Sequence, residues 1–156
     1  MSVGPALAAP GEENDYQDVF IRRVVASYAR VTGKQELNDQ AGCSAWFGDF
    51  ALLTHRGDPR AMLNYGNKCA LDLWECDWQQ FTATPSSATA PDDDRASREA
   101  MMQQVVRDGF VSGYEGRRVS RTGRPFLIQD VTIWRLLEEN GDSFGVAAYF
   151  SRYRYL

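Results

Sequence analysis

The sequence predicts an α+β fold: a single antiparallel five-stranded sheet, helices inserted between strands 2 and 3, and an N-terminal helical extension. Three observations support it. Short apolar runs typical of strands follow residue 49, and apolar residues recur at helical spacing from 68 to 108. In the last third of the chain, apolar and polar residues alternate on either side of two turns. Two groups of strands separated by helices favour one sheet over repeated β-α-β units. The 156 residues suffice for one domain but not for two independent cores.

The chain divides into three segments by composition. Residues 1–13 contain Pro5 and Pro10 and lack the basic start of a signal peptide, so we expect a short disordered tail. Residues 14–45 form the helical extension, with a second short helix around 42–47. Residues 46–156 form the main domain.

The extension begins with an amphipathic helix over residues 14–32, which Asn14 can cap and Gly33 ends. Its apolar side chains recur at helical spacing. They are Tyr16, Val19, Phe20, Val24, Tyr28 and Val31. Either the domain's own sheet or a second copy of the chain must cover this stripe. We expect it to pack on a partner's sheet, which would make the protein a homodimer.

The next elements build one side of the sheet. Residues 50–55 are an apolar run that suits a buried strand, and residues 62–65 form a second strand after a Gly-Asp-Pro turn. Two short helical pieces follow at 68–75 and 78–81. A polar loop over 82–90 leads to a longer helix.

That helix spans residues 92–108, and its acidic first turn favours the positive end of the helix dipole. Strands at 114–120 and 125–137 flank a Gly-containing hairpin turn, and the last strand covers 144–153. The strict alternation of side chains along the last strand predicts that four residues face the same side of the sheet. They are Phe144, Val146, Ala148 and Phe150.

Charge and cysteine content exclude several classes. Lys and Arg total 17 against 21 Asp and Glu, a net charge of -4, so the basic excess of a nucleic-acid-binding surface is missing. A basic cluster near the hairpin, which we interpret as a solvated rim, comprises Arg117, Arg118, Arg121 and Arg124. No apolar run approaches the length of a membrane span. The three cysteines, Cys43, Cys69 and Cys76, indicate reduced thiols and a cytoplasmic protein.

His55 is the only histidine. Multi-histidine metal sites are therefore impossible, and no cysteine spacing fits tetrahedral zinc, so we expect no metal. No Gly-rich phosphate loop or nucleophile elbow is present. We expect no catalysis, and an enzyme that uses His55 with a nearby carboxylate remains as an alternative.

Several short segments in one collinear order resemble the MEKHLA domain. They are Thr54-His55, Asp58-Pro59, Asn64-Tyr65-Gly66-Asn67, Ala70-Leu71-Asp72-Leu73-Trp74-Glu75, Pro85-Ser86, Thr89-Ala90, Gly109-Phe110, residues 114–120, Thr122-Gly123-Arg124-Pro125-Phe126 and residues 145–148. The resemblance covers roughly residues 46–150 and implies a PAS-related fold, which the element order also indicates. It implies a free-standing module that senses small molecules, light or redox state, or that binds proteins.

Two residues depart from the family pattern. Arg135 and Val146 stand where the resemblance implies an Asn and a Gln, so any ligand contact made by those amides is lost here. No flavin signature is present, because Cys69 lacks the residues that surround the reactive cysteine of flavin-binding relatives. No haem signature is present, because His55 ends a strand and not a helix. The cofactor, if one exists, is unknown.

A ligand cavity between helices and sheet would use polar residues at strand ends and aromatic residues of the core. The candidates are His55, Asn64, Tyr65, Asn67, Cys69, Trp74, Met101, Phe126, Trp134 and Val146. Each has a simpler interpretation as core filling or as a partner for buried backbone groups. Tyr149, Tyr153 and Tyr155, which alternate with Arg152 and Arg154, form a candidate face for a partner.

The sequence thus favours a stand-alone PAS-like signalling module that binds a small ligand or a protein partner. The alternative is a dimeric interaction protein with a filled core.

Overall fold

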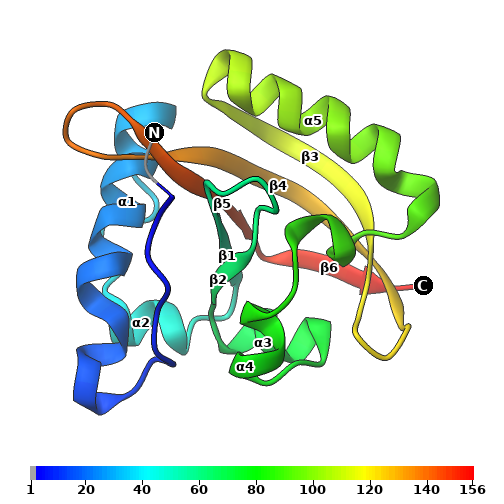
Figure 1. The fold of residues 1–156 in the computed structure, drawn as a ribbon, viewed down its shortest axis with the longest axis horizontal. Coiled ribbons are helices and arrows are strands. Elements are labelled where there is room, and N and C mark those ends of the chain that lie inside the picture. The colour runs from blue at the N-terminus through cyan, green and yellow to red at the C-terminus, as the bar shows by residue number, and fades with distance from the viewer. Residues whose placement is uncertain (1–2) are drawn as a thin grey trace.

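One twisted antiparallel sheet forms the centre of the molecule (Figure 1). The structure is a computed structural model that describes residues 3–156. The strands are β1 (Ala51–Arg56), β2 (Leu63–Gly66), β3 (Phe110–Val119), β4 (Pro125–Leu137), β5 (Ser143–Phe150) and β6 (Arg152–Tyr155). They run in the order β2-β1-β5-β4-β3, and β6 pairs with the first half of β4. The predicted fold class is confirmed.

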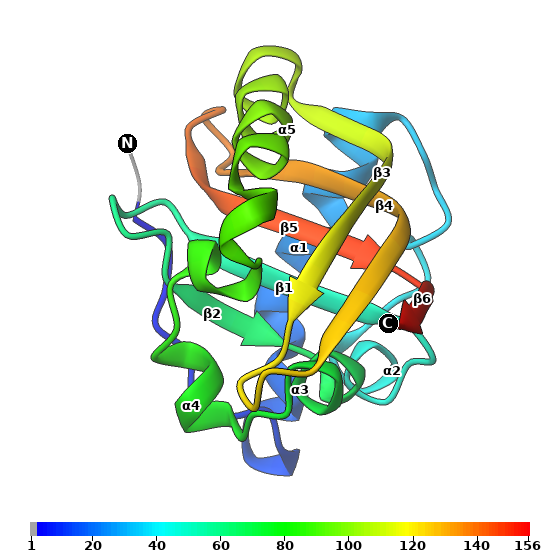
Figure 2. The same ribbon diagram turned by 90° about the vertical axis from the view of Figure 1, so that its right-hand side faces the viewer.

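Helices cover both faces of this sheet (Figure 2). They are α1 (Asp18–Thr32), α2 (Gly42–Trp46), α3 (Lys68–Trp74), α4 (Trp78–Thr82) and α5 (Arg95–Asp108), with 3-10 turns η1 (Glu12–Gln17), η2 (Ser86–Thr89) and η3 (Asp92–Asp94). The α1 and α2 helices lie on one face, and α3 to α5 lie on the other. The sheet therefore separates two apolar cores.

The α1 helix packs on the sheet of its own chain. Phe20, Val24 and Tyr28 are buried there, and the ring of Tyr28 meets that of Trp134 edge-on at 4.7 Å between centroids. The indole N–H of Trp134 donates a hydrogen bond of 3.3 Å to the carbonyl of Val24. This corrects the expectation that the stripe lies on a partner's sheet, because the chain's own sheet occupies it.

The buried face of α1 is also rotated from the predicted stripe. Val19 is 79% exposed, whereas Ile21 and Val25 are buried, and Tyr16 and Val31 are only partly buried. The sheet contacts the side of α1 that carries Ile21 and Val25 as well as the predicted Phe20, Val24 and Tyr28. The helix also begins at Asp18 rather than at 14, because η1 ends in three residues with left-handed backbone.

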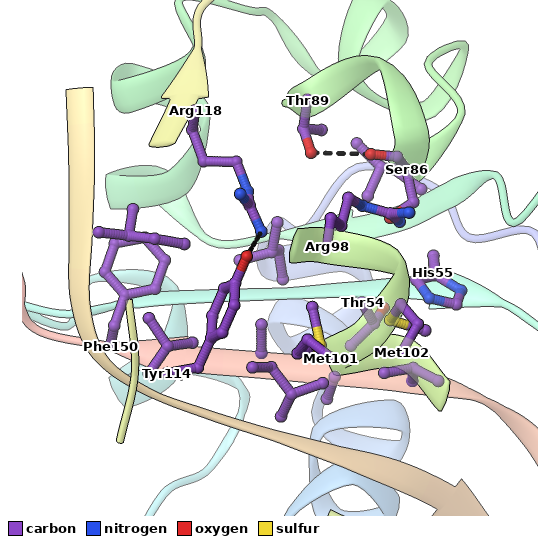
Figure 3. Close-up of a pocket in the computed structure, with 18 of the residues that line it drawn as sticks. Thr54, His55, Ser86, Thr89, Arg98, Met101, Met102, Tyr114, Arg118 and Phe150 are labelled. Carbon is purple, nitrogen blue, oxygen red and sulfur yellow. Dashed lines mark hydrogen bonds between the residues drawn. The ribbon is translucent and has the colours of Figure 1, made fainter. Parts of the chain in front are cut away.

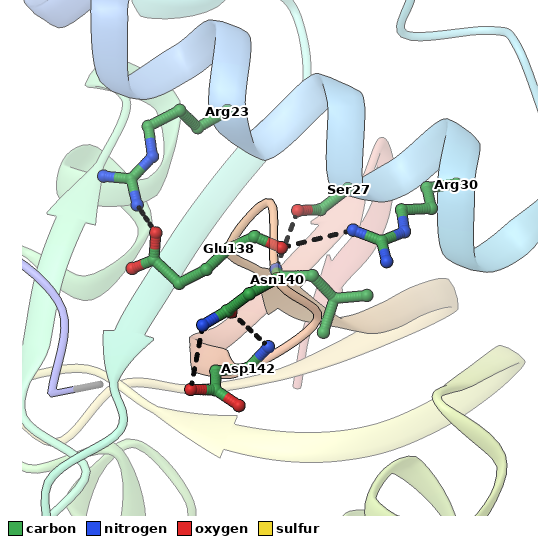
Figure 4. A network of polar contacts seen from close by, with 7 residues as sticks. Arg23, Ser27, Arg30, Glu138, Asn140 and Asp142 are labelled. Carbon is green, nitrogen blue, oxygen red and sulfur yellow. Dashed lines mark hydrogen bonds and ion pairs between the residues drawn. The ribbon is translucent and has the colours of Figure 1, made fainter. Parts of the chain in front are cut away.

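Polar contacts also fasten α1 to the β4–β5 hairpin (Figure 4). Arg23 pairs with the Glu138 carboxylate at 2.9 Å, and Arg30 donates to the Glu138 carbonyl at 3.2 Å. The backbone N–H of Leu137 donates to the Ser27 hydroxyl at 2.9 Å. The α1 helix is thus held against the sheet by polar as well as apolar contacts.

The N-terminal segment is ordered from Val3 onward, unlike the disordered tail that we expected for 1–13. The carbonyl of Val3 accepts from the backbone N–H of Gly57, at 2.8 Å. The carbonyl of Pro5 accepts from the Asn64 amide, at 2.9 Å. These contacts tie the segment along the β1–β2 edge. Residues 1 and 2 lie outside the described residues.

The alternation expected for the last strand fails at Gly145. Leu136 pairs with Gly145 but Leu137 pairs with Ser143, so the β4–β5 register shifts there. Phe144 consequently faces α1, while residues 146, 148 and 150 face the opposite core. Only glycine fits this position, because a Cβ atom would lie 2.2 Å from the carbonyl oxygen of His55 in β1.

Candidate functional site

A cavity of about 60 Å³ lies between α5 and the facing side of the sheet (Figure 3). Residues from β1, β2, η2, α3, α5, β3, β4 and β5 surround it. Its apolar wall consists of Leu53, Leu63, Trp74, Met101, Met102, Ile128, Val131, Ile133, Val146, Ala147, Ala148 and Phe150. Its polar groups are Thr54, His55, Ser86, Thr89, Arg98, Tyr114 and Arg118.

Arg98 reaches the cavity from the buried side of α5. Its Nη2 atom donates a hydrogen bond of 2.6 Å to the Ser86 hydroxyl, and no carboxylate of residues 3–156 lies within ion-pair distance of it. Burial, and after it the positive charge of Arg118, lowers the pKa of Arg98. The cavity therefore carries an uncompensated cation.

Arg118 enters from β3 and is only 5% exposed. It donates to the Arg117 carbonyl at 2.7 Å and to the Tyr114 hydroxyl at 3.3 Å. Its nearest carboxylate is that of Asp94, at 3.6 Å, which also accepts from the Arg117 backbone N–H at 2.8 Å. The solvated-rim interpretation is wrong for Arg118, because its side chain is buried beside Asp94 of the acidic turn before α5.

The ring of His55 lines the cavity. Its Nδ1 atom lies 2.9 Å from the carbonyl of Arg56, which fixes the proton on Nδ1. The Nε2 atom is buried without a partner among the described residues. Burial lowers the pKa of the ring, and the charge of Arg98 lowers it further. Asp58 holds the turn that follows, because its carboxylate accepts a hydrogen bond from the backbone N–H of Met62.

Four of the ten predicted cavity residues line the cavity: His55, Trp74, Met101 and Val146. The structure also makes Val146 the direct cross-strand partner of Arg135. The two departures from the family pattern therefore stand opposite each other, and Val146 contributes an apolar wall.

Two predicted amides serve the backbone and not the cavity. Asn67 is fully buried, and its side chain accepts from the N–H groups of Leu52 and Ala70 and donates to the carbonyls of Ala45 and Phe50. It therefore caps α3 and joins it to β1 and α2.

Asn64 accepts a hydrogen bond of 2.5 Å from the Thr54 hydroxyl and donates to the carbonyl of Pro5. Its amide thus joins the N-terminal segment to β2. Asn67 has no donor or acceptor left for a ligand. Asn64 keeps one N–H group and one lone pair, but it does not line the cavity.

The other four candidates lie elsewhere. Tyr65 and Trp134 belong to the core under α1. Phe126 packs between Trp74 and Tyr155. Cys69 faces a surface groove beside β6, and burial raises the pKa of its thiol.

Sequence reasoning missed the two arginines and the η2 hydroxyls. A signal for Arg98 exists: it stands three, four and seven residues before Met101, Met102 and Val105, on one helical face. Arg118 has no comparable signal, because its burial depends on the ion pairs between the start of α5 and β3.

The predicted aromatic face divides in two. Tyr149 is partly buried and packs edge-on against Phe50 on the α1 side. Tyr153 and Tyr155 are 40% and 44% exposed on β6, and Arg124 stacks over the Tyr155 ring at 3.4 Å.

Two other features of the described residues bear on the class of the site. Within residues 3–156, His, Cys, Asp and Glu form no group that could hold a metal ion. The helices of this part of the chain are too short or too polar to cross a bilayer.

Comparisons with known proteins agree with this architecture. The family model described as the MEKHLA domain matches residues 18–155, so the match includes α1 and α2 as well as the sheet. No curated protein sequence matches the chain.

The fold is similar to that of solved PAS and light-oxygen-voltage domains. The PAS domain of a protein from Colwellia psychrerythraea superposes with a TM-score of 0.62 at 16% identity, over 73% of this chain and 92% of that one. An RNA-binding light-oxygen-voltage receptor gives 0.60 at 15% identity, over 69% and 30%. A light-oxygen-voltage domain studied with a flavin analogue gives 0.56 at 10% identity, over 68% and 76%.

Proposed function

This chain belongs to the MEKHLA domain family, and we propose that it is a PAS-like sensory module that binds a small molecule without catalysing a reaction. The bound molecule occupies the cavity between α5 and the sheet. Binding is transmitted as a change in how the protein associates with copies of itself.

The observation that carries the proposal is the composition of this cavity. Ligand sites are typically apolar hollows with a few convergent polar groups that fix orientation. Here a wall of aliphatic and aromatic side chains meets two arginines, four hydroxyl-bearing residues and one histidine. Side chains that only fill a core are apolar, so an arginine without an ion-pair partner at this position indicates a role beyond packing.

A flavin does not fit this cavity. Cofactor sites typically enclose about 300–1,000 Å³, whereas this cavity measures about 60 Å³. Cys69, the residue nearest to a flavin motif in the sequence, lies outside it in a surface groove. The ligand that we propose is therefore smaller than a flavin, and its chemistry is not that of a photoadduct.

The absence of catalysis is supported by His55. General-base catalysis needs an imidazole oriented by a second group and facing a nucleophile. The Nδ1 atom of His55 meets a backbone carbonyl, and its buried Nε2 atom faces no hydroxyl or thiol partner within the described part of the chain.

For the output we propose a homodimer that forms through β6. This strand pairs with β4 along one edge only, and all four of its residues are exposed. Antiparallel pairing of two β6 strands about the point between Tyr153 and Arg154 would set every Arg opposite a Tyr, which is a favourable cation–π arrangement. Light scattering of the full chain tests the dimer. Arg154→Glu should shift it toward monomer, while the exposed Arg60→Glu should not.

The sensory proposal is tested by filling the cavity. Ala148 lines it, so Ala148→Leu should abolish the thermal shift that small-molecule ligands give the wild-type protein. Ala100→Leu is the matched control, because Ala100 is exposed on α5. Circular dichroism checks that both variants fold. If a ligand stabilises the wild type and a folded Ala148→Leu equally, it binds elsewhere and the proposed site is wrong.

A further inference from the structure

We propose that the cavity recognises a small organic acid, with its carboxylate held by Arg98 and its hydrocarbon part against the apolar wall. This inference rests on the proposed function and specifies the chemical class of the ligand. It follows from the charge, the hydrogen-bonding inventory and the size of the cavity.

The charge of the cavity is positive. Two guanidinium groups, of Arg98 and Arg118, approach it from α5 and β3 (Figure 3). Among residues 3–156, the only carboxylate within ion-pair distance of either group is that of Asp94, at 3.6 Å from Arg118, and it already accepts a backbone hydrogen bond. A cation removed from water without an ion pair is costly, and an anionic ligand offsets that cost.

Most of the unused hydrogen-bonding capacity around the cavity consists of donors, and the one buried acceptor without a partner among the described lining residues is the Nε2 atom of His55. A guanidinium carries five N–H groups and no acceptor, and Arg98 uses one group, on the Ser86 hydroxyl. The indole N–H of Trp74, which also lines the cavity, is buried without a partner in residues 3–156. Donors of this kind select an acceptor-only group, and a carboxylate matches the planar fork of an arginine.

The rest of the lining separates a carboxylate from an inorganic anion. Opposite the arginines the wall is formed by Met101, Val146 and Phe150 together with other aliphatic side chains. A phosphate ion would leave this surface in contact with water, whereas a hydrocarbon chain would cover it. At about 60 Å³, the cavity is smaller than the cavity of about 150 Å³ that holds benzene, so the acid is short and aliphatic.

A route into the cavity passes beside the same arginine. Arg98 and Met102 also line a shallow depression on the outer side of α5, together with Val106. These two side chains therefore stand between the cavity and solvent. Rotation of Arg98 away from Ser86 would open the way for an anion and attract it at the same time.

Calorimetric titration of the full chain with sodium acetate, butyrate and hexanoate tests the inference. Butyramide is the uncharged analogue of butyrate, and inorganic phosphate is an anion without a hydrocarbon part. We expect butyrate to bind at least about tenfold more tightly than butyramide, because a charge-assisted pair on Arg98 is lost in the amide. Equal binding of butyrate and butyramide would overturn the inference, as would tighter binding of phosphate.

Two variants assign the effect to Arg98. Arg98→Met keeps the length and apolar stem but removes the charge, and it should lower butyrate affinity by at least about tenfold. Arg107→Met is the control, since Arg107 is an exposed arginine of the same helix that pairs with Asp108. A structural role for Arg98 would lower the melting temperature of the ligand-free protein in Arg98→Met, whereas a binding role leaves it unchanged or raises it.

The experiments distinguish a failure of this inference from a failure of the proposed function. If no acid binds but an uncharged molecule stabilises the wild type and not Ala148→Leu, the cavity is a ligand site for another class and the inference about acids is wrong. If neither acids nor uncharged molecules distinguish wild type from Ala148→Leu, both fail.

Discussion

Replacing Asn67 with Ala should destabilise the protein as strongly as the loss of a large core side chain. The side chain is fully buried between β1, α2 and α3. Its oxygen accepts from the N–H groups of Leu52 and Ala70, both at 3.1 Å. Its nitrogen donates to the carbonyls of Ala45 and Phe50, at 2.9 and 2.7 Å. Alanine leaves four backbone groups without these partners.

The magnitude follows from those four contacts. Loss of the α3 cap costs about 1 kcal/mol, and each of the other three hydrogen bonds contributes about 1 kcal/mol when its partner is left buried. The expected decrease in the free energy of unfolding is therefore about 4 kcal/mol, a large part of the roughly 5–15 kcal/mol of a typical domain. The melting temperature should fall by about 8–16 °C.

Urea unfolding followed by tryptophan fluorescence measures this decrease. Asn67→Asp separates the two halves of the side chain, because it keeps the accepting oxygen and replaces the donating nitrogen, so it should still be destabilised by at least about 2 kcal/mol. Asn38→Ala, at an exposed position, is the control and should change stability by less than about 0.5 kcal/mol. A decrease below about 1 kcal/mol for Asn67→Ala would refute the assignment of a structural role.

Three further predictions concern the sheet, the cavity and α1. Gly145→Ala should lower the urea midpoint of unfolding far more than Gly113→Ala. Both glycines have positive φ, but only at Gly145 would the new Cβ atom lie 2.2 Å from a backbone carbonyl oxygen, that of His55. Equal midpoints for the two variants would contradict the close approach of β5 to β1. The folded-state pKa of His55 lies below its usual 6.5 because of burial, so the unfolded chain binds the proton first, and stability should fall as the pH decreases below 6.5. His55→Gln should reduce this slope below pH 6.5, and an unchanged slope would exclude His55 as its source. Tyr28→Phe removes the hydroxyl that donates to the Glu36 carboxylate, and it should destabilise the protein by about 1 kcal/mol at neutral pH. Because this hydrogen bond holds the pKa of Glu36 below its usual value, the destabilisation should shrink as acid protonates Glu36. Equal losses of stability in urea unfolding at neutral and acidic pH would disprove the link.

The element order was predictable because its signals are local. Helical spacing, glycine turns and alternating strands each depend on a few neighbouring residues. The errors came from long-range geometry. Phe144 changes face because the close approach of Gly145 to β1 shifts the register of β5. Val19 is exposed because the sheet contacts the side of α1 that carries Ile21 and Val25.

The candidate site was harder to predict, because the sequence does not show which side of the sheet a residue faces or which backbone groups need a partner. Asn67 was a reasonable ligand residue by type, yet the chain crossing above it uses all of its hydrogen bonds. Arg118 belongs to a basic run that sequence analysis places in solvent. Only the fold brings Asp94 near it and buries it.

The two faces of the sheet have different capacities for change, and this determines where a signal can begin. Under α1 the aromatic side chains are closely packed, and the helix is bound to the β4–β5 hairpin by Arg23 and Arg30. The α5 helix buries only Met101 and Val105 along its 14 residues. A helix with so few buried contacts needs less free energy to move. Any ligand larger than about 60 Å³ must displace a wall of the cavity, and α5 is the wall that yields at the lowest cost. Its displacement would also change the pairing of Asp93 and Asp94 with β3. If the cavity binds a ligand as we propose, β3 is therefore the strand that should respond first.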